Sequence, residues 1–316
     1  MNIENNKFLF YVCAGLTASG NDGYDHSDAD ISVLAREIHF ANFSDDIKAW
    51  FARARTGQVE VNPYWPRGSA LAAACFFMDD NYTFDISHFL SFIKRAGISD
   101  PVGKKDFKNW VIDLPDILRS IEYNHAIEEL WAEYCDIVNA RSLKWQRNIK
   151  IAVDSVKRFF LNKYGENMFE LSFAPNLFAP HSADFVRVRN RIIVIASSPD
   201  AETILHEAMH VALTKYREKF TAHAEEYGLG AFADTGKMLE LGYMEDESTA
   251  SVARAIEECF ARALSVILSG GKDEHLQVHS DSGFDSVPFL GWNIRRLKIS
   301  YVNLGEFIDK ALNKIR

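Results

Sequence analysis

Apolar residues recur about every 3.6 positions along most of the first half of the chain, a spacing that places them on one face of a helix. Ile31, Leu34 and Ile38 are an example. The pattern predicts helices over residues 30–38, 45–54, 69–78 and 86–96, and three more between 106 and 163, with breaks near 114–115 and 140–142.

The pattern changes after residue 165. Residues 169–173 and 185–196 alternate between apolar and polar positions or run in β-branched residues, which predicts strands. Arg187, Arg189 and Arg191 alternate with apolar residues around a bend expected at Asn190, so we expect a solvent-facing side or a sheet edge there. Helical spacing returns over 201–213, 247–268 and 304–315, and residues 269–290 are expected to form a loop.

These elements predict an α+β chain that is mostly helical, with one small mixed sheet directly before the helix at 201–213. Residues 1–165 are expected to form a helical N-terminal region, either as part of the same domain or as a separate one. Residues 166–316 are expected to form the core that carries the chemistry.

The composition is that of a globular protein. The 316 residues are 47% hydrophobic and 25% charged, which excludes disordered and collagen-like chains. Asp and Glu number 44 against 35 Lys and Arg, and the formal net charge is −9. A protein that binds the phosphate backbone needs a positive surface, so we expect no nucleic-acid partner.

The apolar stretch at residues 8–18 is too short to cross a membrane, because a spanning helix needs about 20 residues. We therefore expect no integral membrane association. Lys7 and the small residues after the stretch fit a signal peptide within residues 1–20, whereas Glu4 weakens the positive charge that such a peptide carries. We favour a buried first helix or strand, and a cytoplasmic location over secretion.

The cysteines are too widely spaced for a disulfide framework or a C-x-x-C metal site. They are Cys13, Cys75, Cys135 and Cys259. We expect four reduced, mostly buried thiols.

The strongest chemical signal is the segment His206-Glu207-Ala208-Met209-His210. It lies in a predicted helix whose start at 197–200 offers a hydroxyl N-cap, a proline and an early acid. Positions i and i+4 of a helix share a face, so both imidazoles can reach one metal ion. Glu207 points to the neighbouring face, where it can deprotonate a metal-bound water. We identify His206 and His210 as metal ligands and Glu207 as the catalytic base, rather than two histidines that merely share a helix face.

A catalytic zinc site needs a third protein ligand. One known arrangement places a histidine six residues after His210, but that position is Tyr216. A carboxylate on the predicted helix at 247–268 remains, and Glu257 and Glu258 lie in its otherwise small and apolar middle. The alternative, that these two acids form a solvated face, stays open at this point.

The two segments together resemble the gluzincin branch of the zincin-like metallopeptidases. The third ligand of that branch is a glutamate in a helix written N-E-x-x-A or similar, and residues 257–261 are E-E-C-F-A. The chain is also similar to a poorly characterised bacterial group of zincin-like domains whose ligand helix is written E-x-x-x-R-A, which matches Glu258 through Ala263. Both likenesses imply Glu258 as the third ligand of a Zn²⁺ ion, with Glu257 where asparagine is commoner. The specific likeness covers about 70 residues, from 187 to 263.

The resemblance also implies a role for the strand before the active helix. In zincins an edge strand above the cleft pairs with an extended substrate backbone, and residues 185–196 would supply it here. The three arginines of this segment would favour acidic or carboxylate-bearing substrates, although charges on a solvated edge explain them equally well.

The chain departs from the gluzincin pattern at one position. Gluzincins often carry Asp four residues after the ligand glutamate, where it orients a zinc histidine, and here that residue is Arg262. Another carboxylate must do this, and Asp246 and Glu247 are candidates. An oxyanion donor is also needed, and gluzincins recruit a Tyr or His for it. The sequence does not rank the available residues, which are Tyr227, Tyr243, His275, His279 and Tyr301.

The sequence therefore predicts a zinc-dependent metallopeptidase that cleaves a peptide or protein substrate through water activated by Glu207. An alternative of another class is a catalytically inactive zincin-like protein that binds or regulates. A third possibility is hydrolysis of a non-peptide substrate, since a Lewis acid with an activated water is not restricted to amides. The first 165 residues are expected to form the other wall of the cleft or a cap over it.

Overall fold

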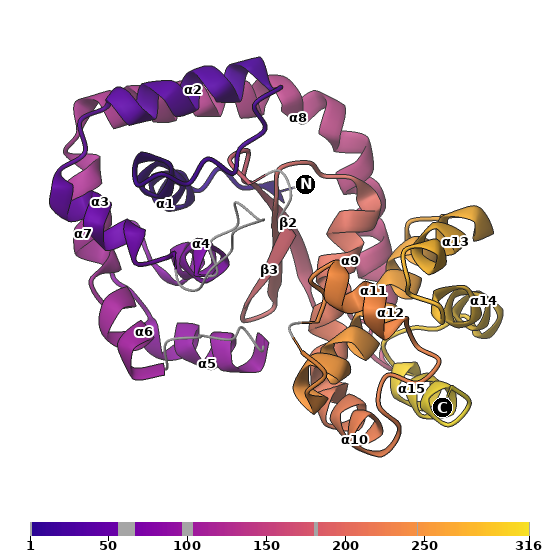
Figure 1. Cartoon of the computed structure of the whole chain (residues 1–316). Helices are drawn as coiled ribbons and strands as arrows, with labels where there is room; N and C mark the ends of the chain where they lie inside the picture. Colours follow the sequence, from indigo (N-terminus) through magenta and orange to yellow (C-terminus); the bar gives the residue numbers. More distant parts are fainter. Residues whose placement is uncertain (1, 56–66, 97–103, 180–182, 245, 316) are drawn as a thin grey trace.

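A small mixed sheet lies between two groups of helices in the computed structural model (Figure 1). The structure describes residues 2–55, 67–96, 104–179, 183–244 and 246–315. The strand order is β1-β2-β4-β3. β1 (Asn2–Ile3), β2 (Glu170–Pro175) and β4 (Arg191–Ala196) run parallel, and β3 (Ala183–Val188) pairs antiparallel with β4 at the edge. The predicted class, α+β and mostly helical, is confirmed.

The predicted strand segment at 185–196 turns where the bend at Asn190 is expected, and it forms two strands. The chain reverses at Arg189, which has a left-handed φ of 55°, and β3 and β4 form a hairpin around it. Arg187 lies over the ring of Phe169, and Arg191 forms an ion pair with Glu4. Of these two strands, β3 is at an edge of the sheet, whereas β4 lies between β2 and β3.

The helices of the first half pack on one side of the sheet, with α1 and α4 surrounded by the others in the view of Figure 1. Residues 9–17 of α1 are buried, as the buried-element alternative for this stretch requires. The helices are α1 (Lys7–Ala18), α2 (Ala29–Phe40), α3 (Asp45–Ala52), α4 (Gly68–Ala74) with a 3₁₀ turn (Cys75–Phe77), α5 (Ile86–Ala96), α6 (Lys104–Val111) and α7 (Leu114–Glu122).

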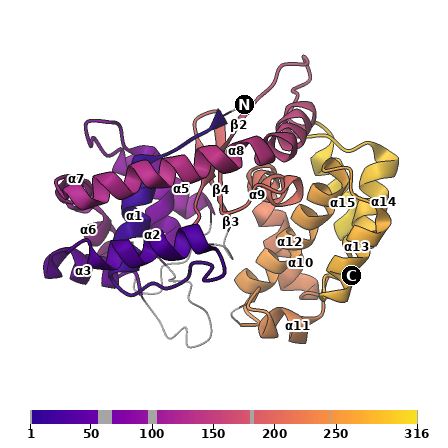
Figure 2. The same cartoon turned by 90° about the horizontal axis from the view of Figure 1, so that it is seen from above.

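The long helix α8 (His125–Phe159) runs across both groups of helices (Figure 2). Its predicted break at 140–142 is wrong, and the chain breaks instead before Asn124, whose side chain caps α8. Arginine is a good helix former, and within the helix the guanidinium of Arg141 pairs with Asp28 at 2.7 Å, while the Ser142 hydroxyl donates to a carbonyl of the preceding turn. No helix within the described residues is both long and apolar enough to span a membrane.

The C-terminal helices pack on the other side of the sheet (Figure 1). They are α9 (Ala201–Leu213) with a 3₁₀ turn (Thr214–Tyr216), α10 (Arg217–Tyr227), α11 (Thr235–Glu240), α12 (Thr249–Leu268), α13 (Asp273–Asp281), α14 (Val287–Leu297) and α15 (Leu304–Leu312). The loop predicted over 269–290 is wrong, because α13 and the start of α14 lie within it. Leu276 is the single buried residue of α13, so this helix has little apolar periodicity to reveal it.

The sheet belongs to both hydrophobic cores. Side chains of a strand alternate between the two faces. Ile192 and Val194 of β4 join the core of the C-terminal helices, while Ile193 and Ile195 join the core of the first half. The second half of α8 also contributes to the C-terminal core. A domain boundary at residue 165 stays a prediction.

Candidate metal centre

Helix α9 carries the predicted motif and lies between the sheet and α12, with further contacts to α8. Its N-cap is Asp200, whose carboxylate accepts hydrogen bonds from the backbone N–H groups of Glu202 and Thr203. The expected hydroxyl cap is therefore wrong, because the acid expected inside the first turn caps the helix itself. Most of the helix is buried, which fixes the face that His206 and His210 present to α12.

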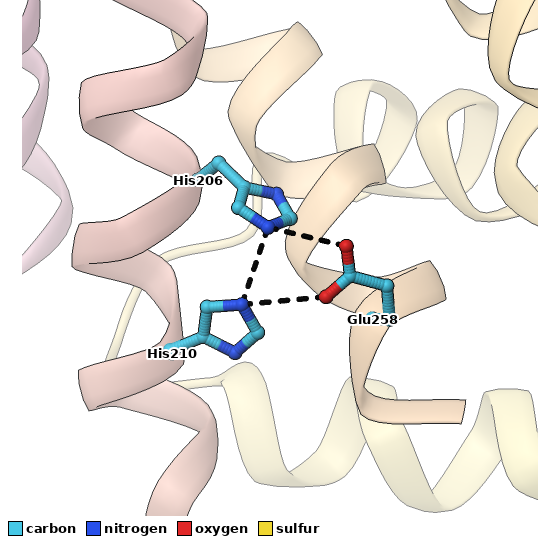
Figure 3. A group of neighbouring side chains, drawn as sticks. All are labelled: His206, His210 and Glu258. Carbon is cyan, nitrogen blue, oxygen red and sulfur yellow. Dashed lines mark hydrogen bonds and ion pairs between the residues drawn. The ribbon is translucent and has the colours of Figure 1, made fainter. Parts of the chain in front are cut away.

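Three side chains converge between α9 and α12 (Figure 3). The Nε2 atoms of His206 and His210 are 3.2 Å apart. Glu258 places one oxygen 3.3 Å from Nε2 of His206 and the other 3.4 Å from Nε2 of His210. A tetrahedral zinc site with ligand bonds of about 2.0–2.1 Å has ligand atoms about 3.3 Å apart. The three contacts are near that spacing, and each imidazole meets a different oxygen of Glu258. Two imidazoles and one carboxylate form a donor set that suits a Zn²⁺ ion.

Glu257 lies beside this group but points elsewhere. Neighbouring residues of a helix point about 100° apart. Glu257 accepts a hydrogen bond from Nδ1 of His210 at 3.0 Å and pairs with Arg217 at 2.8 Å. Its residue surface is 3% exposed, so the solvated face considered for the two glutamates is wrong. With the proton of His210 on Nδ1, Nε2 keeps a lone pair for a metal.

The carboxylate that contacts Nδ1 of a candidate ligand histidine is thus Glu257, and not Asp246 or Glu247. Asp246 accepts hydrogen bonds from its neighbour Ser248, and Glu247 is exposed. The sequence placed Glu257 next to the ligand but gave no signal for its partner, because that partner comes from another helix.

Arg262 occupies the position where gluzincins often carry Asp, and it acts on the ligand carboxylate. Its guanidinium donates to Glu258 at 2.7 Å and to Nδ1 of His279 at 3.1 Å. His279 in turn donates through Nε2 to Glu202 at 2.8 Å. The guanidinium also lies 4.1 Å from the ring centre of Phe284. Arg262 therefore holds the carboxylate of Glu258 in place.

Burial and charge shift the pKa values of these groups in different directions. Burial raises the pKa of Glu207 to about 8. Burial alone would lower the pKa of His210, but its contacts with Glu257 and Glu258 more than offset this and raise it. Burial opposes ionisation of Glu258, yet the histidines and Arg262 hold its pKa well below the usual range. A divalent cation on the three ligands would favour the ionised form of Glu207, which a general base requires.

The site opens into a cavity of about 800 Å³. Glu207 lines this cavity together with the three candidate ligands and with Ala183, Asp184 and Phe185 of β3. Among the described residues, the lining comes from positions 183–279. The expectation that residues 1–165 form a wall or cap finds no support there, although Arg217 donates a hydrogen bond to the carbonyl of Arg95 at the end of α5.

The cavity lining includes some of the other residues singled out from the sequence and not others. Tyr243 and His279 line it, whereas Tyr227, His275 and Tyr301 are not among its described lining residues. Arg187, Arg189 and Arg191 are not among them either, so they give no support for acidic substrates. The arginines that line the cavity are Arg217, Arg254 and Arg262.

Comparisons with protein-family models, with curated proteins and with solved structures found no match to this chain. The site is therefore interpreted from its own geometry and donor chemistry, and the resemblance to gluzincins stays a prediction.

Proposed function

We propose that the chain is a zinc-dependent hydrolase of the gluzincin type that cleaves peptide bonds. His206, His210 and Glu258 would hold the Zn²⁺ ion, and Glu207 would be the catalytic base. The observation that carries this proposal is the convergence of two imidazole nitrogens and one carboxylate, 3.2–3.4 Å apart, at the wall of a cavity. This donor set is typical of catalytic zinc sites that keep an open position.

The residues of the site divide the chemistry between them. A Zn²⁺ ion on these ligands would polarise a substrate carbonyl and lower the pKa of water. Glu207 is buried, lines the same cavity and has an oxygen 4.0 Å from Nε2 of His206, so it is close enough to act beside the ligands. It would accept the proton of the attacking water and pass it to the leaving nitrogen. Glu257 and Arg262 would keep His210 and Glu258 oriented.

The edge strand β3 favours a peptide as the substrate. Residues 183–185 line the cavity, and among the described strands β3 pairs on one side only, with β4. The unpaired side of an edge strand can pair with an extended backbone. A peptide bound in this way would lie across the cavity beside the candidate metal ligands.

Tyr243 is the best candidate for the oxyanion donor. Both ring nitrogens of His279 already have partners, Arg262 and Glu202. Tyr243 lines the cavity, and its ring lies 5.0 Å from the guanidinium of Arg262. Its hydroxyl would donate to the oxygen on which negative charge develops.

The test combines zinc content with cleavage of a peptide library, read by mass spectrometry. The wild type should hold one zinc per chain and cleave peptides. Glu207→Gln should keep the zinc and lose turnover, while Glu218→Gln, a change at an exposed position on α10, should match the wild type. Zinc binding without cleavage of any peptide would favour the inactive binding protein. A chain without zinc, even after supplementation, would overturn the proposal.

A further inference from the structure

Asp184 lines the cavity, and among the described residues it has no basic partner. Its carboxylate accepts a hydrogen bond from the Ser69 hydroxyl at 2.9 Å, and none of the described lysines, arginines or histidines pairs with it. Four other carboxylates of the lining accept hydrogen bonds from nitrogen, and they are Asp200, Glu202, Glu257 and Glu258. Glu207 is the other exception, and the proposed reaction already gives it a role.

A carboxylate in this position is costly unless a cation approaches it. Burial raises the pKa of Asp184 to about 6, so the group is still ionised at neutral pH. Burial is the largest cause of the raised pKa of Glu207, and the nearby charge of Asp184 raises that pKa further. The described part of the lining contains six carboxylates and three arginines, an excess of negative charge that a divalent ion only partly offsets. A positive charge in the cavity would therefore be stabilised.

The place of Asp184 in the fold puts it along the expected path of the substrate. It lies near the start of the edge strand β3 and pairs with Ile195 of β4. Its neighbour Phe185 stacks on the ring of His210 with a centroid distance of 5.8 Å. Asp184 also borders a second pocket of about 50 Å³, whose lining includes Val12 and Leu16 of α1. A substrate backbone along β3 would carry a neighbouring group past this carboxylate.

We propose that Asp184 binds a positively charged group of the substrate and so determines which peptides the site accepts. The group is an ammonium or a guanidinium, supplied either by a free amino terminus or by a Lys or Arg side chain. The inference rests on the proposed hydrolase function and adds a substrate class to it. Asp184 is a specificity-determining residue rather than a participant in bond cleavage.

The experiment uses pairs of peptides that differ in one charge. One pair has a free or an acetylated amino terminus, and the other has Lys or norleucine near the cleaved bond, so the two sources are read separately. The wild type should prefer the charged member of one pair. Asp184→Asn should lower kcat/KM for that member by about 10–100-fold, mainly through KM, because a hydrogen bond to a charged group is worth about that factor. The neutral member should change by less than about 3-fold.

Three control variants separate charge from structure. Asp184→Glu keeps the charge and should retain the preference. Ser69→Ala removes the hydroxyl that touches Asp184 and should also retain it. Glu218→Gln removes a negative charge at an exposed position on α10, outside the described lining of the cavity, and should leave the preference unchanged. A thermal melt of each variant checks the fold.

A binding measurement distinguishes failure of this inference from failure of the hydrolase proposal. Fluorescence anisotropy with labelled peptides is read on Glu207→Gln and on Glu207→Gln/Asp184→Asn. Cleavage by the wild type with the same charge preference in Asp184→Asn overturns the role of Asp184 and leaves the hydrolase standing. Absence of cleavage together with binding that needs both a charged peptide and Asp184 supports the role and overturns the hydrolase. Binding of charged and neutral peptides alike overturns the role.

Discussion

A substitution of Glu257 would test whether the hydrogen-bond partner of His210 controls metal binding. Glu257→Gln keeps the shape of the side chain but removes the charge that accepts the Nδ1 proton at 3.0 Å and pairs with Arg217 at 2.8 Å. Hydrogen bonds to charged groups are worth about 1.5–3 kcal/mol, or about 10- to 150-fold in an equilibrium constant. Loss of such a partner of a zinc histidine costs about 10- to 100-fold in metal affinity. We expect Glu257→Gln to weaken Zn²⁺ binding by about 10- to 100-fold and still to bind one ion.

The assay is competition for Zn²⁺ with a chromophoric chelator at fixed pH and ionic strength. Glu258→Gln removes a candidate ligand and should cost far more than Glu257→Gln. Arg217→Ala leaves the His210–Glu257 contact in place and removes the ion pair with Glu257 and the hydrogen bond to the carbonyl of Arg95, so we expect a smaller loss of Zn²⁺ affinity than in Glu257→Gln. Unchanged affinity in Glu257→Gln would refute the orienting role. A loss as large as that of Glu258→Gln would show that Glu257 is itself a ligand.

Three further outcomes are expected. Tyr243→Phe should lower kcat by about 100-fold with zinc content and KM unchanged, since it removes the proposed oxyanion donor, and an unchanged kcat would exclude Tyr243. Phe260→Ala removes a fully buried ring and should lower the free energy of unfolding, measured in urea, by about 3–5 kcal/mol. A loss of less than about 1 kcal/mol would contradict close packing around this ring. Burial raises the pKa of Asp184 from 3.8 to about 6, so the folded state binds this proton more tightly than the unfolded state. This contribution to the free energy of unfolding is complete below about pH 4 and is lost as the pH rises through 6, by at most about 3 kcal/mol. Unfolding curves of Asp184→Asn should lack this part of the pH dependence.

The elements that the sequence predicts well are those whose signal is local. The helical spacing and the motif of α9 are both contained within 13 residues, and the side chains of His206 and His210 lie together as the spacing predicts. That these side chains bind zinc stays a prediction. The strands β2 and β4 are likewise predicted, because buried strands are short apolar runs.

The features that the sequence misses have different physical reasons. The predicted break in α8 is wrong because Arg141 is itself a good helix former, and its guanidinium pairs with Asp28, the N-cap of α2. The turn between β3 and β4 lies where a bend is expected, at Asn190, but its left-handed residue is Arg189, although asparagine adopts that conformation more readily than arginine. Helix α13 buries little and so carries little pattern.

The adjacent acids of α12 show why two neighbouring positions could not be told apart from sequence and yet have separate tasks. An imidazole has two nitrogens on different sides of the ring, and a metal histidine uses one for the ion and the other for an orienting partner. Glu258 faces Nε2 of His210 at 3.4 Å, and Glu257 faces Nδ1 at 3.0 Å. The turn of about 100° between neighbouring helix positions allows one helix to reach both sides of the ring. Each acid also has its own arginine, because Arg217 pairs with Glu257 and Arg262 with Glu258. If the proposed Zn²⁺ ion is bound, Glu258 is its ligand and Glu257 the orienting neighbour, and a change at either position should alter metal binding through a different nitrogen of the same histidine.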